Sequence, residues 1–327
     1  MSRPPLLDVQ GLKMHFPVNG GLLYRQIATV HAVDGVDLQV GEKETLGLVG
    51  ESGCGKSTTG RAILRLYKPT AGKIIFNGQD ISTMKEAELR PVREHIQMVF
   101  QDPMDSLNSR QTVAEILEEP LIIFKKGDKA SRQKKIRSLL DTCGMPLSAL
   151  SRYPHEFSGG QRQRVGIARA LALNPKLVVC DEPVSALDVS IQAQILNLLV
   201  DLQNEFRISF LFIAHDLSVV RHISDRVAVM YLGQVVEIAN ADTLYKKPRH
   251  PYTKALIASV PEIEAWKRSA RKKPLAGEVP SPMNPPPGCR FSTRCPLVTD
   301  KCRQVQPTLA PKEQGDADHL VACHHAD

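Results

Sequence analysis

The sequence lacks a long apolar run, an export signal and any internal repeat. No stretch of its 327 residues approaches the roughly 20 consecutive apolar residues that a membrane-spanning helix needs. The N-terminal residues MSRPPLLDVQ do not show the basic and then apolar segments of a signal peptide. We therefore expect a soluble protein of the cytosol. Its length suits one large domain with a tail.

The net charge and the positions of the cysteines suggest classes of ligand but do not identify one. The net charge of +7 and the pI near 9.0 suit nucleic acid, an anionic membrane surface or phosphate-bearing ligands. Three of the seven cysteines are scattered, and the other four crowd the C-terminal tail: Cys289, Cys295, Cys302 and Cys323. In a reducing cytosol such crowding favours a metal site over disulfides.

Apolar patterning predicts strands that alternate with helices. Strands are expected at 34–40, 45–49, 96–100, 177–180 and 209–213, and helices at 56–66, 160–173 and 189–205. This alternation predicts a mostly parallel sheet covered on both faces. Between Phe100 and Phe157 the strand signal disappears, and 112–121 and 129–143 look helical. Nine of the 23 prolines lie between Pro274 and Pro311, so regular structure should be sparse there, and something besides a core would have to order the tail.

A phosphate loop of the form G-x-x-x-x-G-K-[ST] follows the strand at 45–49 and opens a predicted helix. Glycines let backbone N–H groups surround phosphate oxygens, and the helix N-terminus adds positive potential. The lysine can reach the β- and γ-phosphates and the serine hydroxyl can ligate Mg²⁺. The nucleotide-binding residues predicted here are Gly50, Glu51, Ser52, Gly53, Cys54, Gly55, Lys56, Ser57 and the following Thr58.

Two carboxylates end the apolar strand at 177–180. Asp181 can hold Mg²⁺ through water, and Glu182 can orient or deprotonate the attacking water. An apolar run followed by acids is common at strand ends, so this pattern gains its weight from the phosphate loop upstream.

The segment from Phe157 to Arg164 resembles the signature sequence of ATP-binding cassette (ABC) proteins. Alone, its Ser-Gly-Gly would be typical of a helix cap. The remaining motifs of the family occur in family order: Gln101 in Phe-Gln-Asp-Pro, Asp188 in Ser-Ala-Leu-Asp, and His215 in Ile-Ala-His-Asp. The resemblance implies an α/β P-loop core with an N-terminal antiparallel β portion and a helical subdomain at about 102–157. It places the ABC nucleotide-binding domain at 1–260 and a Pro/Cys-rich extension at 261–327.

The resemblance also implies a role for each motif. Glu182, His215 and Gln101 would be catalytic, with His215 on the γ-phosphate and Gln101 sensing Mg²⁺ and the attacking water. Mg²⁺ would be held through Ser57, Gln101 and Asp181. The residues expected to reach a nucleotide on the opposite subunit are Ser158, Gly159, Gly160, Gln161 and Asp188. An aromatic residue near the N-terminus stacks on adenine in the family, and we predict Phe16, with Tyr24 as the competitor.

The C-terminal third resembles a particular subfamily. Pro248–Leu256, Gly277–Cys289 and Arg294-Cys-Pro296 are similar to the extension of dipeptide and oligopeptide importer ATPases, particularly the second ATPase subunit of a dipeptide permease. The same extension occurs in importers of nickel, glutathione and opine-like solutes, so the cargo stays open between peptide and these solutes.

Three rival classes fit less well. A chromosome-maintenance ATPase would place a long coiled coil between Ser57 and Ser158, and a translation-factor ATPase would carry two cassettes. The assignment as an exporter ATPase does not explain the Cys-rich tail. A dead cassette would not keep Lys56, Asp181 and Glu182 together with His215.

The four tail cysteines are spaced Cys289-x5-Cys295-x6-Cys302-x20-Cys323. These spacings are wider than the C-x₂₋₄-C pairs usual for zinc, which favours a [4Fe–4S] cluster, and the subfamily resemblance implies the same. A zinc site that uses the neighbouring His324 and His325, or four unliganded thiols, remain the alternatives.

The resemblance implies a set of partners and a location. Two ATPase chains would meet head to tail, and the second would be a related but different subunit. Two transmembrane permease subunits and an extracytoplasmic solute-binding protein would complete the transporter, with no nucleic acid. The chain would lie peripherally on the cytoplasmic face of a bacterial inner membrane.

Overall fold

A computed structural model describes residues 4–20, 25–102, 106–259, 277–312 and 317–326. By internal contacts the chain divides into a first unit, Met1–Val40, Thr45–Thr83 and Ala214–Asp327, and a second unit, Gly41–Glu44 and Met84–Ile213. The predicted boundary between 260 and 261 lies outside the described residues. In the part of the chain that is described, no helix has the length and apolar character needed to cross a bilayer.

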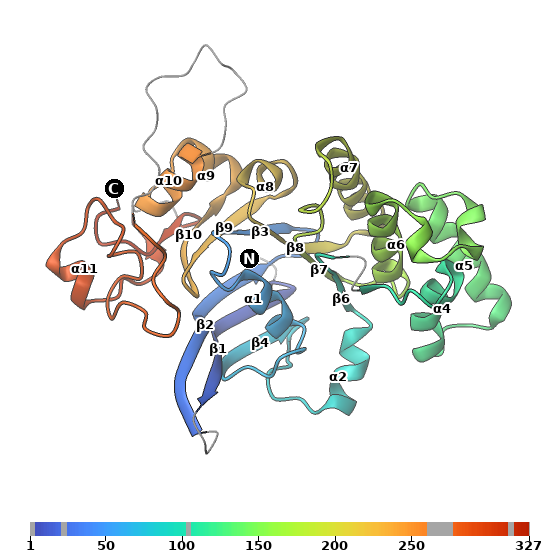
Figure 1. Cartoon of the computed structure of the whole chain (residues 1–327), viewed down its shortest axis with the longest axis horizontal. Helices are drawn as coiled ribbons and strands as arrows, with labels where there is room; N and C mark the ends of the chain where they lie inside the picture. The colour runs from blue at the N-terminus through green and yellow to red at the C-terminus, as the bar shows by residue number, and fades with distance from the viewer. Residues whose placement is uncertain (1–3, 21–24, 103–105, 260–276, 313–316, 327) are drawn as a thin grey trace, which may run out of the picture. The chain divides into compact units, whose positions relative to one another are not determined.

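The first unit begins with a four-stranded antiparallel sheet in the order β2-β1-β4-β5, drawn in blue in Figure 1. Its strands are β1 (Leu7–Gly20), β2 (Arg25–Val40), β4 (Ala71–Phe76) and β5 (Gln79–Asp80). The strand predicted at 34–40 is thus the end of a longer strand, and β1 was not predicted. The expected N-terminal antiparallel β portion is confirmed.

The other strands of the first unit follow the order β11-β12-β10-β9-β3. They comprise β3 (Thr45–Val49), β9 (Arg226–Tyr231), β10 (Gln234–Asn240), β11 (Ala310–Pro311) and β12 (Leu320–Val321). Strand β3 pairs parallel to β9, while β9, β10, β12 and β11 pair antiparallel. The helices are α1 (Lys56–Ile63), α8 (Leu217–Ile223), α9 (Ala241–Lys246), α10 (Pro251–Ser259) and α11 (Asp300–Gln304).

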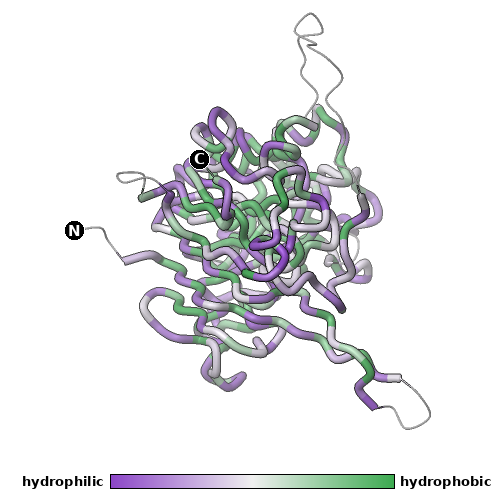
Figure 2. The backbone as a smooth tube through the Cα atoms, turned by 90° about the vertical axis from the view of Figure 1, so that its left-hand side faces the viewer, coloured by the Kyte–Doolittle hydropathy of each residue, from purple (hydrophilic) through white to green (hydrophobic). Residues whose placement is uncertain are grey.

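Helix α1 ends earlier than the predicted 56–66. Arg65 adopts a left-handed backbone conformation, with φ of 55°, which a helix cannot continue. Strand β3 has its predicted bounds, and all five of its residues are buried. Such a continuous apolar run is typical of a strand covered on both faces. Figure 2 colours the trace by hydropathy, and hydrophobic stretches alternate with hydrophilic ones along it.

The second unit has a parallel set of strands, β6 (Ile96–Val99), β7 (Leu177–Asp181) and β8 (Ser209–Ala214), in the order β8-β7-β6. Helix α2 (Glu86–Arg93) precedes β6. Between β6 and β7 lie α4 (Val113–Ile123), α5 (Lys129–Thr142), the short 3₁₀ helices Leu147–Ser151 and Pro154–Glu156, and α6 (Gly159–Leu171). Helix α6 contacts β6, α4 and α5, and α7 (Val189–Phe206) packs on α6 (Figure 1). The helical insertion is therefore present.

The C-terminal extension is ordered partly by core contacts that the sequence did not predict. Phe291 is fully buried and packs edge to face on Tyr231, with ring centroids 5.3 Å apart. Strand β12 adds to β10 through Val321 and Leu320. A tail short of regular structure was expected, and its three short elements agree with that. The expectation that something besides a core would have to order the tail was incomplete, because Phe291 and Val321 of the tail are fully buried in the first unit.

A buried polar cluster fixes the start of α10. Glu237 on β10 accepts hydrogen bonds from the backbone N–H groups of Arg249 and His250 at 2.7 and 3.0 Å, and His319 of the extension lies 2.7 Å away. Burial lowers the pKa of His250 to about 4, and its Nδ1 accepts from the N–H of Tyr252 at 3.0 Å. This ring is therefore neutral when folded.

We expect acid to destabilise the first unit through His250. The folded pKa lies below the ordinary 6.5, so this stabilisation is complete above pH 6.5 and is lost as the pH falls from 6.5 to 4. The loss should approach roughly 3 kcal/mol. His250→Asn keeps an acceptor for Tyr252 and should flatten the pH dependence of the urea midpoint, while the exposed His222→Asn should not. An unchanged pH dependence in His250→Asn would contradict this assignment.

Candidate functional site

The phosphate loop connects β3 to α1, as its pattern predicts, and its glycines are required by shape. Gly50 and Gly55 have φ of 155° and 105°, and an added Cβ would come within 2.1 Å of the carbonyl oxygens of Met230 and Ala32, respectively. Only glycine fits such contacts. Helix α1 begins at Lys56 without a side-chain cap, which leaves its N-terminus suited to an anion.

Lys56 folds over the loop. The residue is only 4% exposed, and Nζ donates to the carbonyl oxygens of Gly50 and Glu51 at 2.8 and 3.0 Å. The ammonium group is thus held against the backbone that would surround phosphate. This placement agrees with a cation that meets the β- and γ-phosphates.

Two side chains from the part of the chain after β10, Tyr252 of α10 and Arg294 of the extension, reach the same loop. Arg294 forms a two-pronged ion pair with Glu51, and the Tyr252 hydroxyl accepts from the Glu51 N–H at 2.9 Å. Sequence reasoning missed both contacts. Tyr252 and Arg294 fall inside the segments that carry the subfamily resemblance, but no spacing connects them to residue 51.

Phe16, the predicted adenine-stacking residue, lies on β1 and is partly exposed. Its ring meets Tyr67 edge to face, with centroids 5.6 Å apart. The competitor Tyr24 lies outside the described residues. His215, two residues before α8, is exposed.

In the second unit, the predicted carboxylates follow β7. Asp181 is fully buried at its end, and Glu182 comes next in a left-handed conformation with φ of 45°. Because Val99 pairs with Cys180, Gln101 and Glu182 leave neighbouring strands at the same edge. Gln101 Nε2 donates to Glu182 Oε2 at 3.2 Å. Two of the predicted catalytic side chains therefore meet.

The signature residues begin α6. Ser158 caps the helix, with its Oγ accepting from the Gln161 N–H at 3.4 Å while Gln161 Oε1 accepts from the Ser158 N–H at 3.1 Å. Ser158 is nevertheless exposed. Asp188 precedes α7 and is exposed, and its neighbour Val189 is 82% exposed. The cap interpretation of Ser-Gly-Gly is correct, and it leaves these groups accessible.

The four tail cysteines lie near one another. Burial raises the pKa of Cys289 to about 11, and negative charge on the other three thiols contributes to the rise. Each sulfur has a polar neighbour: backbone N–H groups of Phe291, Leu297 and His325 donate to Cys289, Cys295 and Cys323, and the Thr299 hydroxyl lies 3.3 Å from Cys302. Such donors stabilise sulfur that bears negative charge, so the group fits a thiolate-ligated centre.

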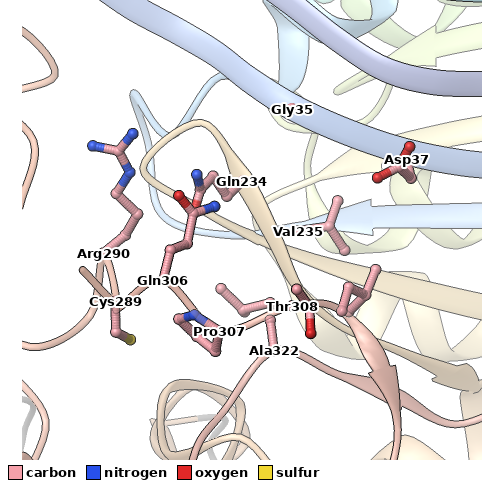
Figure 3. Close-up of a pocket in the computed structure, with 12 residues that line it drawn as sticks. Gly35, Asp37, Gln234, Val235, Cys289, Arg290, Gln306, Pro307, Thr308 and Ala322 are labelled. Carbon is pink, nitrogen blue, oxygen red and sulfur yellow. The ribbon is translucent and has the colours of Figure 1, made fainter. Parts of the chain in front are cut away.

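The cysteine group borders a pocket of about 410 Å³ in the first unit. Figure 3 shows Cys289 and Arg290 on the side of the extension and Gly35 and Asp37 on β2. Gln234 on β10 also lines it. Cys289 is therefore beside a cavity rather than inside a closed core.

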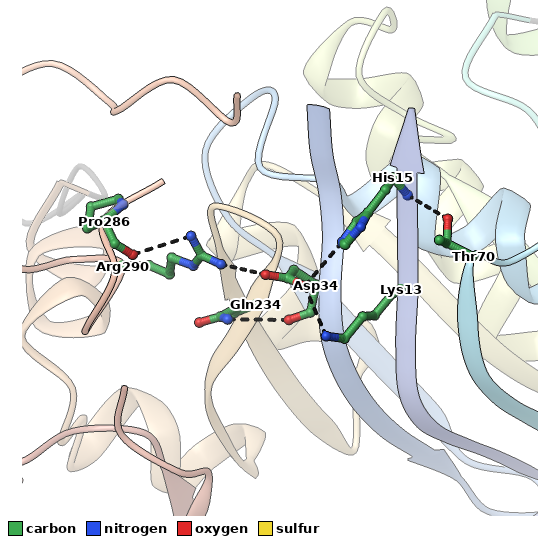
Figure 4. A network of polar contacts seen from close by, with 7 residues as sticks. All are labelled: Lys13, His15, Asp34, Thr70, Gln234, Pro286 and Arg290. Carbon is green, nitrogen blue, oxygen red and sulfur yellow. Dashed lines mark hydrogen bonds and ion pairs between the residues drawn. The ribbon is translucent and has the colours of Figure 1, made fainter. Parts of the chain in front are cut away.

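A polar network joins the extension to β1 and β2 (Figure 4). Asp34 on β2 pairs with Arg290, with His15 at 3.1 Å and with Lys13 at 3.6 Å. Among the described residues, His15, His31 and Asp34 are the group whose metal-type ligand atoms all lie within 4.8 Å of one another. Because Arg290 and Lys13 already neutralise the carboxylate, this group is better explained as an attachment point for the extension.

The predicted site residues divide between the units. The phosphate loop, Phe16, His215 and the cysteines belong to the first unit, and Gln101, Asp181, Glu182 and the signature belong to the second.

Comparison with known proteins gives matches over nearly the whole chain. Residues 33–185 match the family described as "ABC transporter", and 236–302 match "Oligopeptide/dipeptide transporter, C-terminal region". The oligopeptide transport ATP-binding protein AppF of Bacillus subtilis is 54% identical and covers 99% of this chain and 98% of its own. The proteins named OppF of Salmonella typhimurium and Escherichia coli are 52% and 50% identical, each covering 100% of this chain and 98% of its own.

Solved structures agree. The ATP-binding cassette MJ0796, in a dimeric post-hydrolysis state with ADP and Pi, matches with a TM-score of 0.65 at 29% identity, covering 72% of this chain and 98% of its own. The protein cbiO1 of Clostridium perfringens matches at 0.64 and 27% identity, covering 75% and 92%. These matches confirm the α/β P-loop fold class. The chain belongs to the ATP-hydrolysing subunits of ABC transporters, in the family of oligopeptide and dipeptide importers.

Proposed function

We propose that this chain powers the import of short peptides by binding and hydrolysing ATP on the cytoplasmic side of the membrane. The observation that carries the cargo assignment is the match at 236–302 to the oligopeptide/dipeptide C-terminal region. Relatives at 50–54% identity are named as oligopeptide transport proteins. Nickel, glutathione or opine-like solutes are the alternative cargoes because the same extension occurs in their importers.

Within the first unit, the phosphate loop would hold the β- and γ-phosphates through its backbone N–H groups and Lys56. Ser57 would contribute a hydroxyl to Mg²⁺, which would neutralise phosphate charge. Phe16 would stack on adenine and His215 would donate to the γ-phosphate. Support comes from the glycine-dependent shape of the loop and from the buried position of Lys56.

Within the second unit, Glu182 would accept a proton from the attacking water and Gln101 would help to orient it. Their 3.2 Å hydrogen bond supports joint action. Asp181 and Gln101 would complete the ligands of Mg²⁺. Ser158, Gly159, Gly160, Gln161 and Asp188 would meet the nucleotide of a second ATPase subunit. The exposure of Ser158, Gln161 and Asp188 supports this role.

The proposed partners are a related second ATPase subunit, two transmembrane permease subunits and an extracytoplasmic solute-binding protein. The test is reconstitution with the neighbouring permease subunits and measurement of solute-stimulated ATPase activity. Peptides should stimulate, and Ni²⁺, glutathione and opines should not. If only one of those solutes stimulates the ATPase activity, the chain powers the import of that solute instead of peptides.

We propose further that Cys289, Cys295, Cys302 and Cys323 hold a [4Fe–4S] cluster that orders the extension. Among the described residues, only His15, His31 and Asp34 bring three metal-type ligand atoms within 4.8 Å of one another, so the thiols are spaced more widely. A single zinc ion with Zn–S bonds of about 2.3 Å needs sulfurs about 3.8 Å apart, whereas an iron–sulfur cluster holds its cysteines further apart.

Anaerobic purification should therefore give a brown protein with about four irons per chain and acid-labile sulfide. Cys295→Ser should lower the iron content and expose the extension to protease. Cys143→Ser serves as a control. Cys143 is buried in the second unit, so its replacement should not change the iron content. A colourless preparation with stoichiometric zinc, or without metal, would rule out the cluster.

A further inference from the structure

The geometry points to Arg294 as a positioning residue for ATP, acting through Glu51 of the phosphate loop. By this pair the C-terminal extension controls how well the loop accepts the nucleotide. The inference rests on the proposed nucleotide site, and it assigns to the extension a part in ATP binding.

The ion pair has the geometry of a specific contact. Arg294 Nη1 lies 2.7 Å from Glu51 Oε2, and Nη2 lies 3.1 Å from Oε1. The arginine side chain is 5% exposed and the glutamate 28%. Parallel hydrogen bonds between a guanidinium and a carboxylate fix both the distance and the orientation of the two groups. Glu51 is thus held by a residue 243 positions away in the sequence.

The surroundings make the arginine rigid. Its guanidinium carbon lies 5.9 Å from the centre of the Tyr231 ring. Tyr231, Tyr252 and Phe291 form an aromatic cluster with centroids 4.7 to 5.4 Å apart. Phe291 comes three residues before Arg294, so the buried ring fixes the turn that presents the guanidinium. A loop residue held this way loses less freedom when it binds a ligand.

Glu51 is held at three points. Its carboxylate meets Arg294, its N–H donates to the Tyr252 hydroxyl at 2.9 Å, and its carbonyl accepts from Lys56 Nζ at 3.0 Å. Two of these three contacts come from the segment after β10, outside the phosphate-loop pattern itself. The conformation of the loop therefore depends on Tyr252 of α10 and, through Arg294, on the extension.

Charge gives the pair a second effect. The phosphates of ATP are strongly negative, and Glu51 places a carboxylate inside the loop that would receive them. Without Arg294 that carboxylate would be uncompensated and would repel the nucleotide. Removing both groups should therefore harm binding less than removing Arg294 alone.

A contact that only attaches the extension would behave differently, and Arg290 provides the matched comparison. It lies four residues before Arg294 and pairs with Asp34 on β2 rather than with the loop. The His31 N–H also donates to Pro282 of the extension at 3.0 Å. Arg290→Ala loosens attachment and leaves the Glu51 pair in place.

The test measures the Kd of a fluorescent ATP analogue with Mg²⁺ on the full chain. Arg294→Ala should raise it roughly tenfold, Arg294→Lys should restore part of the loss, and Arg294→Ala with Glu51→Gln should return within about threefold of the wild type. Glu51→Gln alone removes the charged partner of Arg294, and its Kd completes the double-variant cycle. Arg290→Ala should bind normally although its melting temperature falls.

Wild-type affinity in both Arg294→Ala and Arg294→Lys, or a double variant as weak as Arg294→Ala, would overturn the inference. Lys56→Ala distinguishes a failure of this inference from a failure of the nucleotide site. If Lys56→Ala also binds normally, the nucleotide site itself is misassigned. If only Lys56→Ala is weak, the site stands and Arg294 has no positioning role. If Arg294→Ala does not fold, the Kd of Arg294→Lys is compared with that of Glu51→Gln. Weaker binding in Arg294→Lys than in Glu51→Gln supports the inference, and equal binding in the two variants contradicts it.

Discussion

Glu182→Gln is expected to abolish turnover while ATP stays bound. The amide has nearly the same shape and can still accept the hydrogen bond that Gln101 Nε2 donates to Glu182 Oε2 at 3.2 Å. It cannot take a proton from the attacking water, a contribution worth roughly 10²- to 10⁴-fold in rate. Phosphate release should therefore fall by at least about 100-fold while the affinity for a fluorescent ATP analogue is unchanged.

Two controls separate this effect from others. Glu205→Gln changes an exposed carboxylate near the end of α7 and should hydrolyse ATP at the wild-type rate. Lys56→Ala should instead lose nucleotide affinity because it removes the cation held at Gly50 and Glu51. Near-normal hydrolysis in Glu182→Gln would show that another residue is the general base.

The parts of the fold predicted best are those whose local sequence has one physical solution. Strand β3 has its predicted bounds because a five-residue apolar run between turn residues can only be buried on both faces. The strand predicted at 177–180 is one residue shorter than β7. The last residue of β7, Asp181, is a buried carboxylate, which is not typical of a strand. Strand β10 was missed for a similar reason: Glu237, fully buried, interrupts its apolar pattern and is stabilised by His319, far along the chain.

Local motifs located the loop, the carboxylates and the signature, but contacts between distant segments could not be predicted. Nothing near Glu51 indicates that Arg294 pairs with it, because a surface-compatible glutamate and an arginine in a Pro-rich tail are each unremarkable locally. No local sequence pattern predicts the burial of Phe291 either. Both depend on how the extension returns to the first unit, which is a property of tertiary packing.

Ser158→Arg is expected to damage the nucleotide site whose phosphate loop belongs to the partner subunit. Ser158 is exposed at the N-terminus of α6, where backbone N–H groups and the helix dipole favour an anion. A long arginine side chain would fill the place of the γ-phosphate. Losing donors to a transferring phosphoryl group should slow hydrolysis there by roughly 100-fold, while the nucleotide on the variant's own loop stays bound.

The measurement labels each subunit of the assembled pair with a photoreactive ATP analogue and follows hydrolysis at each loop. Because Ser158 also caps α6 through the Gln161 N–H, its replacement costs about 1 kcal/mol of helix stability by itself. Ser158→Asp keeps a capping acceptor yet presents a carboxylate to the phosphate, so it should fail as Ser158→Arg does although its stability is normal. Ser151→Arg, an exposed change in the nearby 3₁₀ helix, should be harmless. Full activity of the chain as a monomer at any dilution, or damage confined to the variant's own loop, would show that the signature does not act across the interface.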